Sequence, residues 1–106
     1  MSNQKQQTEQ NGDAEKQVPE QLDGRNVVER FNTSDGRDVA ILEGKGKDSQ
    51  RAVEMAGDDP GTYPDALKHI LVRIDGKKLT VEDFGELPLK VYNQISTRFN
   101  NLYFLE

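Results

Sequence analysis

Apolar side chains are scarce in the first part of the chain and recur at regular spacing from Val27 onward. Between residues 2 and 24 the hydrophobic positions are Ala14, Val18 and Leu22, set among glutamine, glutamate, lysine and aspartate. So polar a segment cannot bury enough apolar surface to offset the entropy lost on ordering. We therefore predict that residues 1–24 form a disordered polar arm, either a solvated tail or a segment that orders on contact with a partner.

Two short β-rich runs come next. One contains Val27, Val28 and Phe31, and the other is Val39–Leu42. The Asp35-Gly36 pair between them favours a tight turn. This arrangement predicts a β-hairpin, one face of which must lie on other elements because a lone hairpin is marginally stable in water.

Helical spacing follows. Asp48 or Ser49 can cap a short helix that ends at Ala56, where Gly57 is a natural stop. A second helix is predicted from Pro64 to Ile74. Its apolar face comprises Tyr63, Leu67, Ile70, Leu71 and Ile74, and its solvent side comprises Asp65, Lys68, His69 and Arg73.

Residues 74–89 combine a turn, a helix start and a helix break. Asp75-Gly76 predicts the turn, and Thr80 with Asp83 predicts a capping box at the start of a short helix. Gly85 and Pro88 end that helix, and Pro88 suits the first position of the next one. The segment is expected to fix how two helical segments meet.

The last helix is predicted from Pro88 to about Tyr103. Residues 25–104 are therefore expected to form one α+β domain, an N-terminal β-hairpin packed on a small bundle of three to four helices. Small domains bury a lower fraction of their surface, so part of an aromatic-rich stripe can remain for a partner. The candidate partner-binding residues on this stripe are Tyr92, Ile95, Phe99, Leu102 and Tyr103.

Composition and net charge exclude several classes of function. A net charge of −5 argues against nucleic-acid binding, which needs a basic face. The chain has no cysteine, so it holds neither disulfides nor thiolate metal sites. No run approaches the roughly 20 apolar residues that span a bilayer, and the polar N-terminus lacks the apolar centre of a signal peptide. We expect a cytoplasmic protein with protein partners, no membrane contact and no cofactor.

Catalytic patterns are missing. His69 is the only histidine, so the serines have little from which to build a nucleophile–base pair. The carboxylate pairs Asp58-Asp59 and Glu82-Asp83 fall at a turn and a helix start, where local roles explain them. The Gly44–Lys47 run lacks the spacing of a phosphate-binding loop, and Asp48 follows it with a charge that repels phosphate. We predict no enzyme, no catalytic residue and no metal ligand.

The order and spacing of several short segments in the chain resemble those of a known protein family. The resemblance rests on Val39–Leu42, on Gly57-Asp58-Asp59-Pro60, on Ile74-Asp-Gly-Lys-Lys-Leu-Thr80, and on Glu82-Asp83 followed by Glu86-Leu-Pro-Leu89. In this spacing the chain resembles the tail assembly chaperones of contractile-tailed bacteriophages, a family of Mu-like phages and their prophage relatives.

The resemblance implies a protein in the bacterial cytoplasm that binds and solubilises the tape measure protein during tail assembly, with other tail proteins as further partners. A structural subunit of a phage tail or related injection apparatus, or a generic protein-binding module, is the alternative. Whether the chain forms a homo-oligomer is left open. Leu105-Glu106 resembles a cloning scar and is excluded from the predicted fold.

Overall fold

The computed structural model describes residues 20–104. The greater part of the predicted arm, residues 1–19, and the predicted scar, residues 105–106, lie outside the described residues. The strands of the described part form one antiparallel sheet in chain order, namely β1 (Gln21–Leu22), β2 (Arg25–Asn32), β3 (Asp38–Leu42), β4 (Val72–Ile74) and β5 (Lys77–Lys78).

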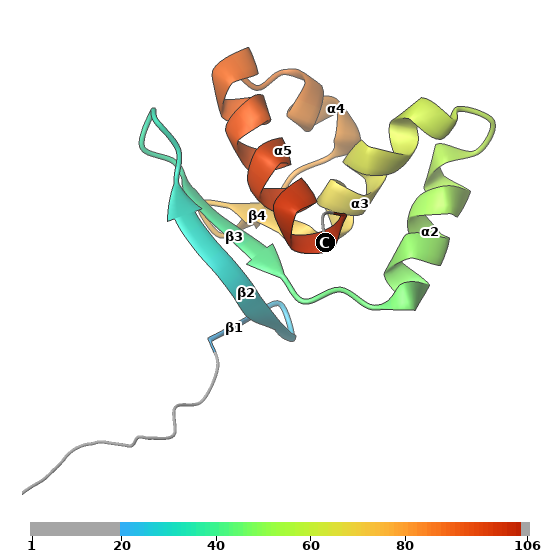
Figure 1. The fold of residues 1–106 in the computed structure, drawn as a ribbon, viewed down its shortest axis with the longest axis horizontal. Coiled ribbons are helices and arrows are strands. Elements are labelled where there is room, and N and C mark those ends of the chain that lie inside the picture. The colour runs from blue at the N-terminus through green and yellow to red at the C-terminus, as the bar shows by residue number, and fades with distance from the viewer. Residues whose placement is uncertain (1–19, 105–106) are drawn as a thin grey trace, which may run out of the picture.

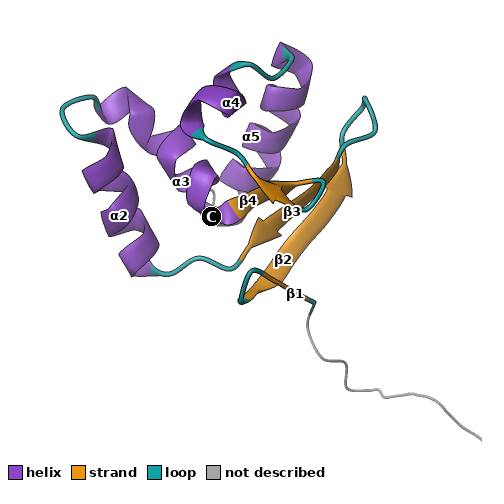
Figure 2. Cartoon of the chain, turned by 180° about the vertical axis from the view of Figure 1, so that it is seen from behind, coloured by secondary structure: helices purple, strands orange, loops and turns teal. Residues whose placement is uncertain are grey.

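Helices gather on one side of this sheet (Figures 1 and 2). They are α2 (Gly46–Ala56), α3 (Tyr63–Leu71), α4 (Val81–Gly85) and α5 (Leu89–Tyr103), with a 3-10 turn at Pro60–Thr62 before α3. The predicted α+β class, a hairpin packed on a small set of helices, is confirmed. The sheet is larger than the predicted hairpin because β1, β4 and β5 extend it.

The predicted β2–β3 hairpin forms with Phe31 opposite Val39. Gly36 has a φ of +90°, a left-handed conformation that glycine adopts without steric cost. The Asp35 carboxylate accepts hydrogen bonds from the Thr33 hydroxyl at 2.6 Å and the Arg37 Nε–H at 2.9 Å. Local polar contacts therefore fix the turn.

Two further hairpins close on Asp-Gly pairs with positive φ at both positions. The pair Asp75-Gly76 joins β4 to β5, with φ values of 52° and 80°. The pair Asp23-Gly24 joins β1 to β2, with φ values of 52° and 78°. Two positive φ values match the two-residue hairpin turn that Asp-Gly favours. The sequence-based boundary at residue 24 was therefore wrong, because residues 20–24 belong to the folded domain.

The predicted helix from Pro64 to Ile74 is too long. It ends at Leu71, and Val72–Ile74 form β4, which pairs antiparallel with β3. Tertiary pairing with β3 decides this segment, because Val72 and Ile74 are β-branched and two residues apart, which suits a short strand.

Two residues predicted on the solvent side of that helix are buried. Lys68 is 3% exposed and Arg73 is 4% exposed. Buried charges need partners, and each has one: the Lys68 Nζ lies 3.3 Å from an Asp65 oxygen, and the Arg73 Nε lies 2.6 Å from an Asp23 oxygen. His69, also predicted to be solvated, is half-buried, with its Nδ1 2.6 Å from the Leu79 carbonyl oxygen.

Helix ends follow the predicted signals with small shifts. Helix α2 begins at Gly46, earlier than predicted, and ends at Ala56, followed by Gly57 with a φ of +57°. The capping box of α4 is confirmed, since the Thr80 hydroxyl accepts from the Asp83 amide at 3.0 Å and the Thr80 amide donates to Asp83 Oδ2 at 3.3 Å. Pro88 lies one position before α5 as its N-cap.

One hydrophobic core joins the two layers. The helices contribute residues such as Leu71, Phe84 and Phe99, which meet the sheet residues Val39 and Ile41. All five side chains are almost fully buried. Burial on this scale contributes on the order of 1.5–3 kcal/mol for each large apolar side chain.

Candidate functional site

A concave surface runs along α3 and α5. Its central hollow has a volume of about 570 Å³ and is lined by Tyr63, Pro64, Lys68, Tyr92, Ser96, Asn100 and Phe104. A hollow of about 220 Å³ shares Tyr63 and Phe104 and extends to the start of α2. A hollow of about 410 Å³ shares Tyr92 and extends to Leu87 and Leu89 near α4. We name this continuous surface the α3–α5 groove.

Large apolar side chains at the groove remain in contact with solvent. Leu89 is 73% exposed and Phe104 is 49% exposed. The Phe104 ring is tilted against the buried Phe99 ring, with centroids 6.2 Å apart, so its position is supported from below. Exposed aromatic and aliphatic anchors beside hollows are the features that protein partners use.

The groove also contains a fixed polar group. The Tyr92 hydroxyl donates to Asp65 Oδ1 at 2.6 Å, and the same oxygen lies 3.3 Å from Lys68 Nζ. Lys68 also lies over the Tyr92 ring, 5.2 Å from its centroid. Desolvation, together with the hydrogen bond to Asp65, raises the pKa of Tyr92. The network holds the ring in place and keeps a neutral phenol in the groove.

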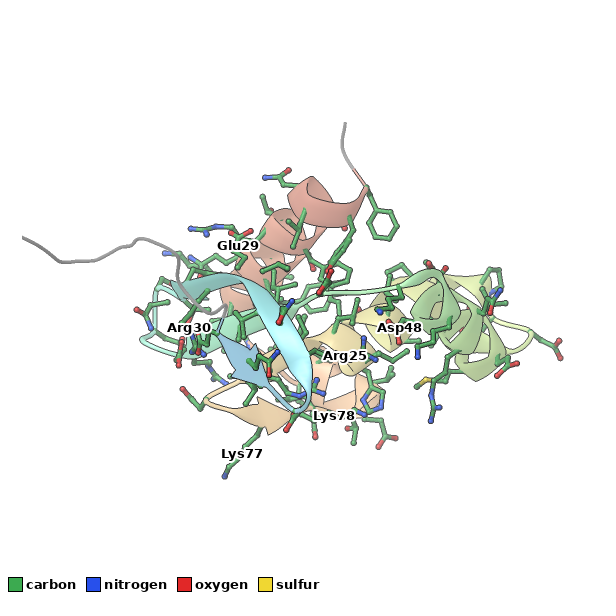
Figure 3. All side chains as sticks on the ribbon, turned by 90° about the horizontal axis from the view of Figure 1, so that it is seen from below. Arg25, Glu29, Arg30, Asp48, Lys77 and Lys78 are labelled. Atoms are coloured by element: carbon green, nitrogen blue, oxygen red, sulfur yellow. The ribbon has the colours of Figure 1, made fainter. Side chains whose placement is uncertain are left out.

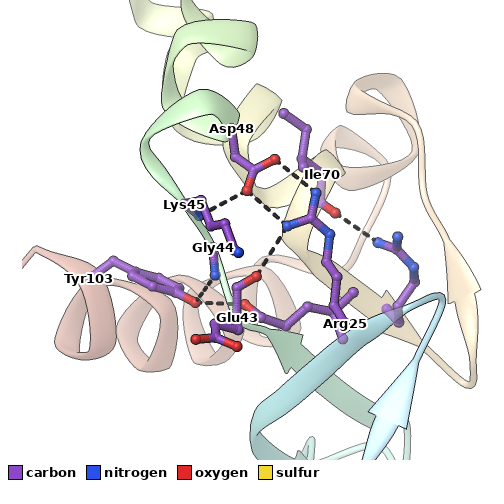
Figure 4. Close-up of polar contacts among 9 residues, drawn as sticks. Arg25, Glu43, Gly44, Lys45, Asp48, Ile70 and Tyr103 are labelled. Atoms are coloured by element: carbon purple, nitrogen blue, oxygen red, sulfur yellow. Dashed lines mark hydrogen bonds and ion pairs between the residues drawn. The ribbon is translucent and has the colours of Figure 1, made fainter.

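Tyr103 has a structural role at the end of α5. Its hydroxyl donates to the Leu42 carbonyl at 2.6 Å and accepts from the Gly44 amide at 3.0 Å (Figure 4). Desolvation raises the pKa of Tyr103. These bonds tie α5 to the loop between β3 and α2.

The predicted partner-binding residues separate into two groups. Ile95 and Phe99 are each 1% exposed, so their assignment to a binding surface was wrong, because they belong to the core. Tyr92 lines the groove, Tyr103 lines the hollow near α2, and Leu102 is 37% exposed. The predicted set of binding residues did not include Leu89 and Phe104. They lie at the two ends of the same apolar stripe of α5, where fewer core residues cover the helix.

A second concavity, the charged cleft, lies on the other side of α2. Its volume is about 630 Å³. The β1–β2 turn, the start of β2, α2, α3 and the β4–β5 hairpin supply its lining: Asp23, Arg25, Lys47, Asp48, Gln50, Arg51, Glu54, Ile70, Arg73 and Lys78. In Figure 3, Arg25 and Lys78 lie near one another, and Lys77 points away from them. Sequence reasoning did not find the cleft, since its charges come from segments far apart in the chain.

An ion pair bridges the charged cleft between β2 and α2. Arg25 Nη1 and Nη2 donate to the two oxygens of Asp48, each at 2.8 Å, and Nη1 also donates to the Glu43 carbonyl at 3.1 Å (Figure 4). The Lys45 amide adds a bond to Asp48 Oδ2 at 2.9 Å. The bond from Arg25 is the main cause that holds the pKa of Asp48 below its usual value.

Residues 20–104 show neither a group of three metal-binding side chains nor a helix long and apolar enough to cross a bilayer. Comparison of the chain with protein-family models, with curated proteins and with solved structures found no match.

Proposed function

We propose that this chain is a protein-binding assembly factor that acts as a tail assembly chaperone for a phage or prophage tape measure protein. The exposed, supported apolar anchors of the α3–α5 groove carry the proposal. The identity of the proposed client rests on the resemblance of the order of turns, caps and helices in the sequence to that family.

A tape measure protein is expected to present helices with apolar stripes before tube protein surrounds it. An amphipathic helix can dock its apolar face into a groove through residues spaced three and four apart. Leu89 and Phe104 lie near opposite ends of the 15-residue helix α5, so a docked client helix can contact both. The acidic net charge of −5 keeps a complex with many copies soluble.

The experiment is co-expression with a tape measure protein from the same phage or prophage, followed by pull-down and sizing. We expect the wild-type chain to hold the client in soluble form. A double variant, Leu89→Ser with Phe104→Ser, should remain folded and bind at least about tenfold more weakly, because buried anchors dominate interface energy.

The matched control is Val53→Ser with Met55→Ser. These two residues are 58% and 41% exposed on α2 and line none of the three hollows. The control should capture client as the wild type does. Equal loss in both variants contradicts the groove as the docking surface. Rings or tubes formed by this chain alone, without capture, favour the structural subunit of a tail.

A further inference from the structure

The charged cleft concentrates positive charge in a chain that is acidic as a whole. Five of its lining side chains are cationic (Arg25, Lys47, Arg51, Arg73, Lys78) and three are anionic (Asp23, Asp48, Glu54). The whole chain has a net charge of −5. The sign of the local charge is therefore opposite to that of the molecule.

The carboxylates already present do not neutralise this charge. Asp48 is occupied by Arg25, and Asp23 by Arg73. Lys47, Arg51 and Lys78 form no ion pair with any residue of the described part, and Glu54 is the one carboxylate left to face them. Lys47 and Arg51 are four residues apart on α2, where like charges repel.

A buried guanidinium also lines the cleft. Arg73 donates through Nε to Asp23 at 2.6 Å and through Nη1 to the carbonyls of Ile70 and Val72 at 3.1 and 3.0 Å. Its Nη2 makes no hydrogen bond to a residue between 20 and 104. Because protein bonds hold the guanidinium through Nε and Nη1, Nη2 is positioned to donate a charge-assisted hydrogen bond to an oxyanion in the cleft.

We propose that the charged cleft binds a compact oxyanion of the phosphate class, with Arg73 at its base and Lys47, Arg51 and Lys78 around it. The anion relieves the repulsion among these cations and accepts a hydrogen bond from Arg73 Nη2. Asp48, which the sequence predicted to repel phosphate, is paired with Arg25. The site differs from a phosphate-binding loop, because side chains rather than a glycine-rich backbone provide the donors.

This site goes beyond the proposed client capture. Helix α2 separates the two surfaces, since Gly46 and Ser49 line the groove side and Lys47 and Arg51 line the cleft side. The test of anion binding uses the full chain without a client. A negative result therefore leaves the chaperone proposal unaffected.

The test is a titration of the full chain with pyrophosphate at low ionic strength. Binding is monitored by the NMR signals of the backbone amides and the arginine side chains. We expect saturable shifts confined to the cleft, including the Arg73 Nε–H. Lys78→Gln should weaken binding about threefold or more, in the range of a single exposed charge pair. Lys77→Gln is the matched control on the same strand and should leave binding unchanged.

A second variant tests whether removing a negative charge strengthens anion binding. Glu54→Gln removes a competing negative charge from the cleft and should tighten pyrophosphate binding about twofold to threefold. Glu86→Gln, which removes a charge that is also exposed but lies outside the cleft, should not. Shifts that spread over the surface without saturating, or equal effects of Lys77→Gln and Lys78→Gln, overturn the proposal, because both indicate attraction by overall charge alone.

Discussion

Three donors occupy the carboxylate of Asp48, two from Arg25 and one from the Lys45 amide. Asp48→Asn keeps the side-chain shape but removes the charge that matches the guanidinium. We expect a loss of about 2 kcal/mol in the free energy of unfolding, measured by urea denaturation, because bonds to charged groups are the stronger ones. Asp58→Asn, at an exposed position that makes no side-chain bond to a described residue, should change stability by less than about 0.5 kcal/mol.

The same residue gives a pH dependence. The pKa of Asp48 is lower in the folded chain than its ordinary value, so the folded state binds that proton less readily than the unfolded state. Its stabilising contribution is therefore present above about pH 4 and is lost as pH falls through the lower, folded pKa. The difference in unfolding free energy between wild type and Asp48→Asn should shrink below pH 4. A constant difference across that range contradicts this account.

At the scale of elements, the β1–β2 turn shows what sequence reasoning could have found. Asp23-Gly24 is the same signal that correctly predicted the turn at Asp75-Gly76, but the polar residues before it outweighed it. The two-residue strand β1 is held by contacts with β2 and by the ion pair from Asp23 to Arg73. The partner residue lies 50 positions away, beyond the reach of local pattern.

We expect Gly24→Ala to destabilise the fold by about 1 kcal/mol. Gly24 has a φ of +78° and no atom lies within 4 Å of an added Cβ, so the cost comes from the backbone alone. Gly85→Ala is the control, because that site is equally open and has no positive φ. Thermal unfolding of the two variants compares them. A Gly24→Ala variant as stable as Gly85→Ala contradicts the left-handed turn.

At the scale of the molecule, the α+β class and the succession of helices were predictable because apolar spacing, caps and turn residues are local. The missed features depend on distant partners. Lys68 and Arg73 were predicted to face solvent because the sequence does not show that Tyr92 lies beside Lys68 and that Asp23 lies beside Arg73. Within the stripe of α5, spacing alone could not tell Phe99, which is buried in the core, from residues that remain in the groove.

That distinction gives the last prediction, which sets stability against binding. Phe99 is 1% exposed in the core, so Phe99→Ala should lower the free energy of unfolding by about 3–5 kcal/mol, a large part of the about 5–15 kcal/mol typical of a domain. Phe104 is 49% exposed, so Phe104→Ala should cost less than about 1 kcal/mol. Urea denaturation measures both values, and pull-down of the tape measure protein measures capture. A Phe104→Ala variant that is stable and weak in capture separates the groove from the core, whereas one that loses stability as Phe99→Ala does assigns Phe104 to the core.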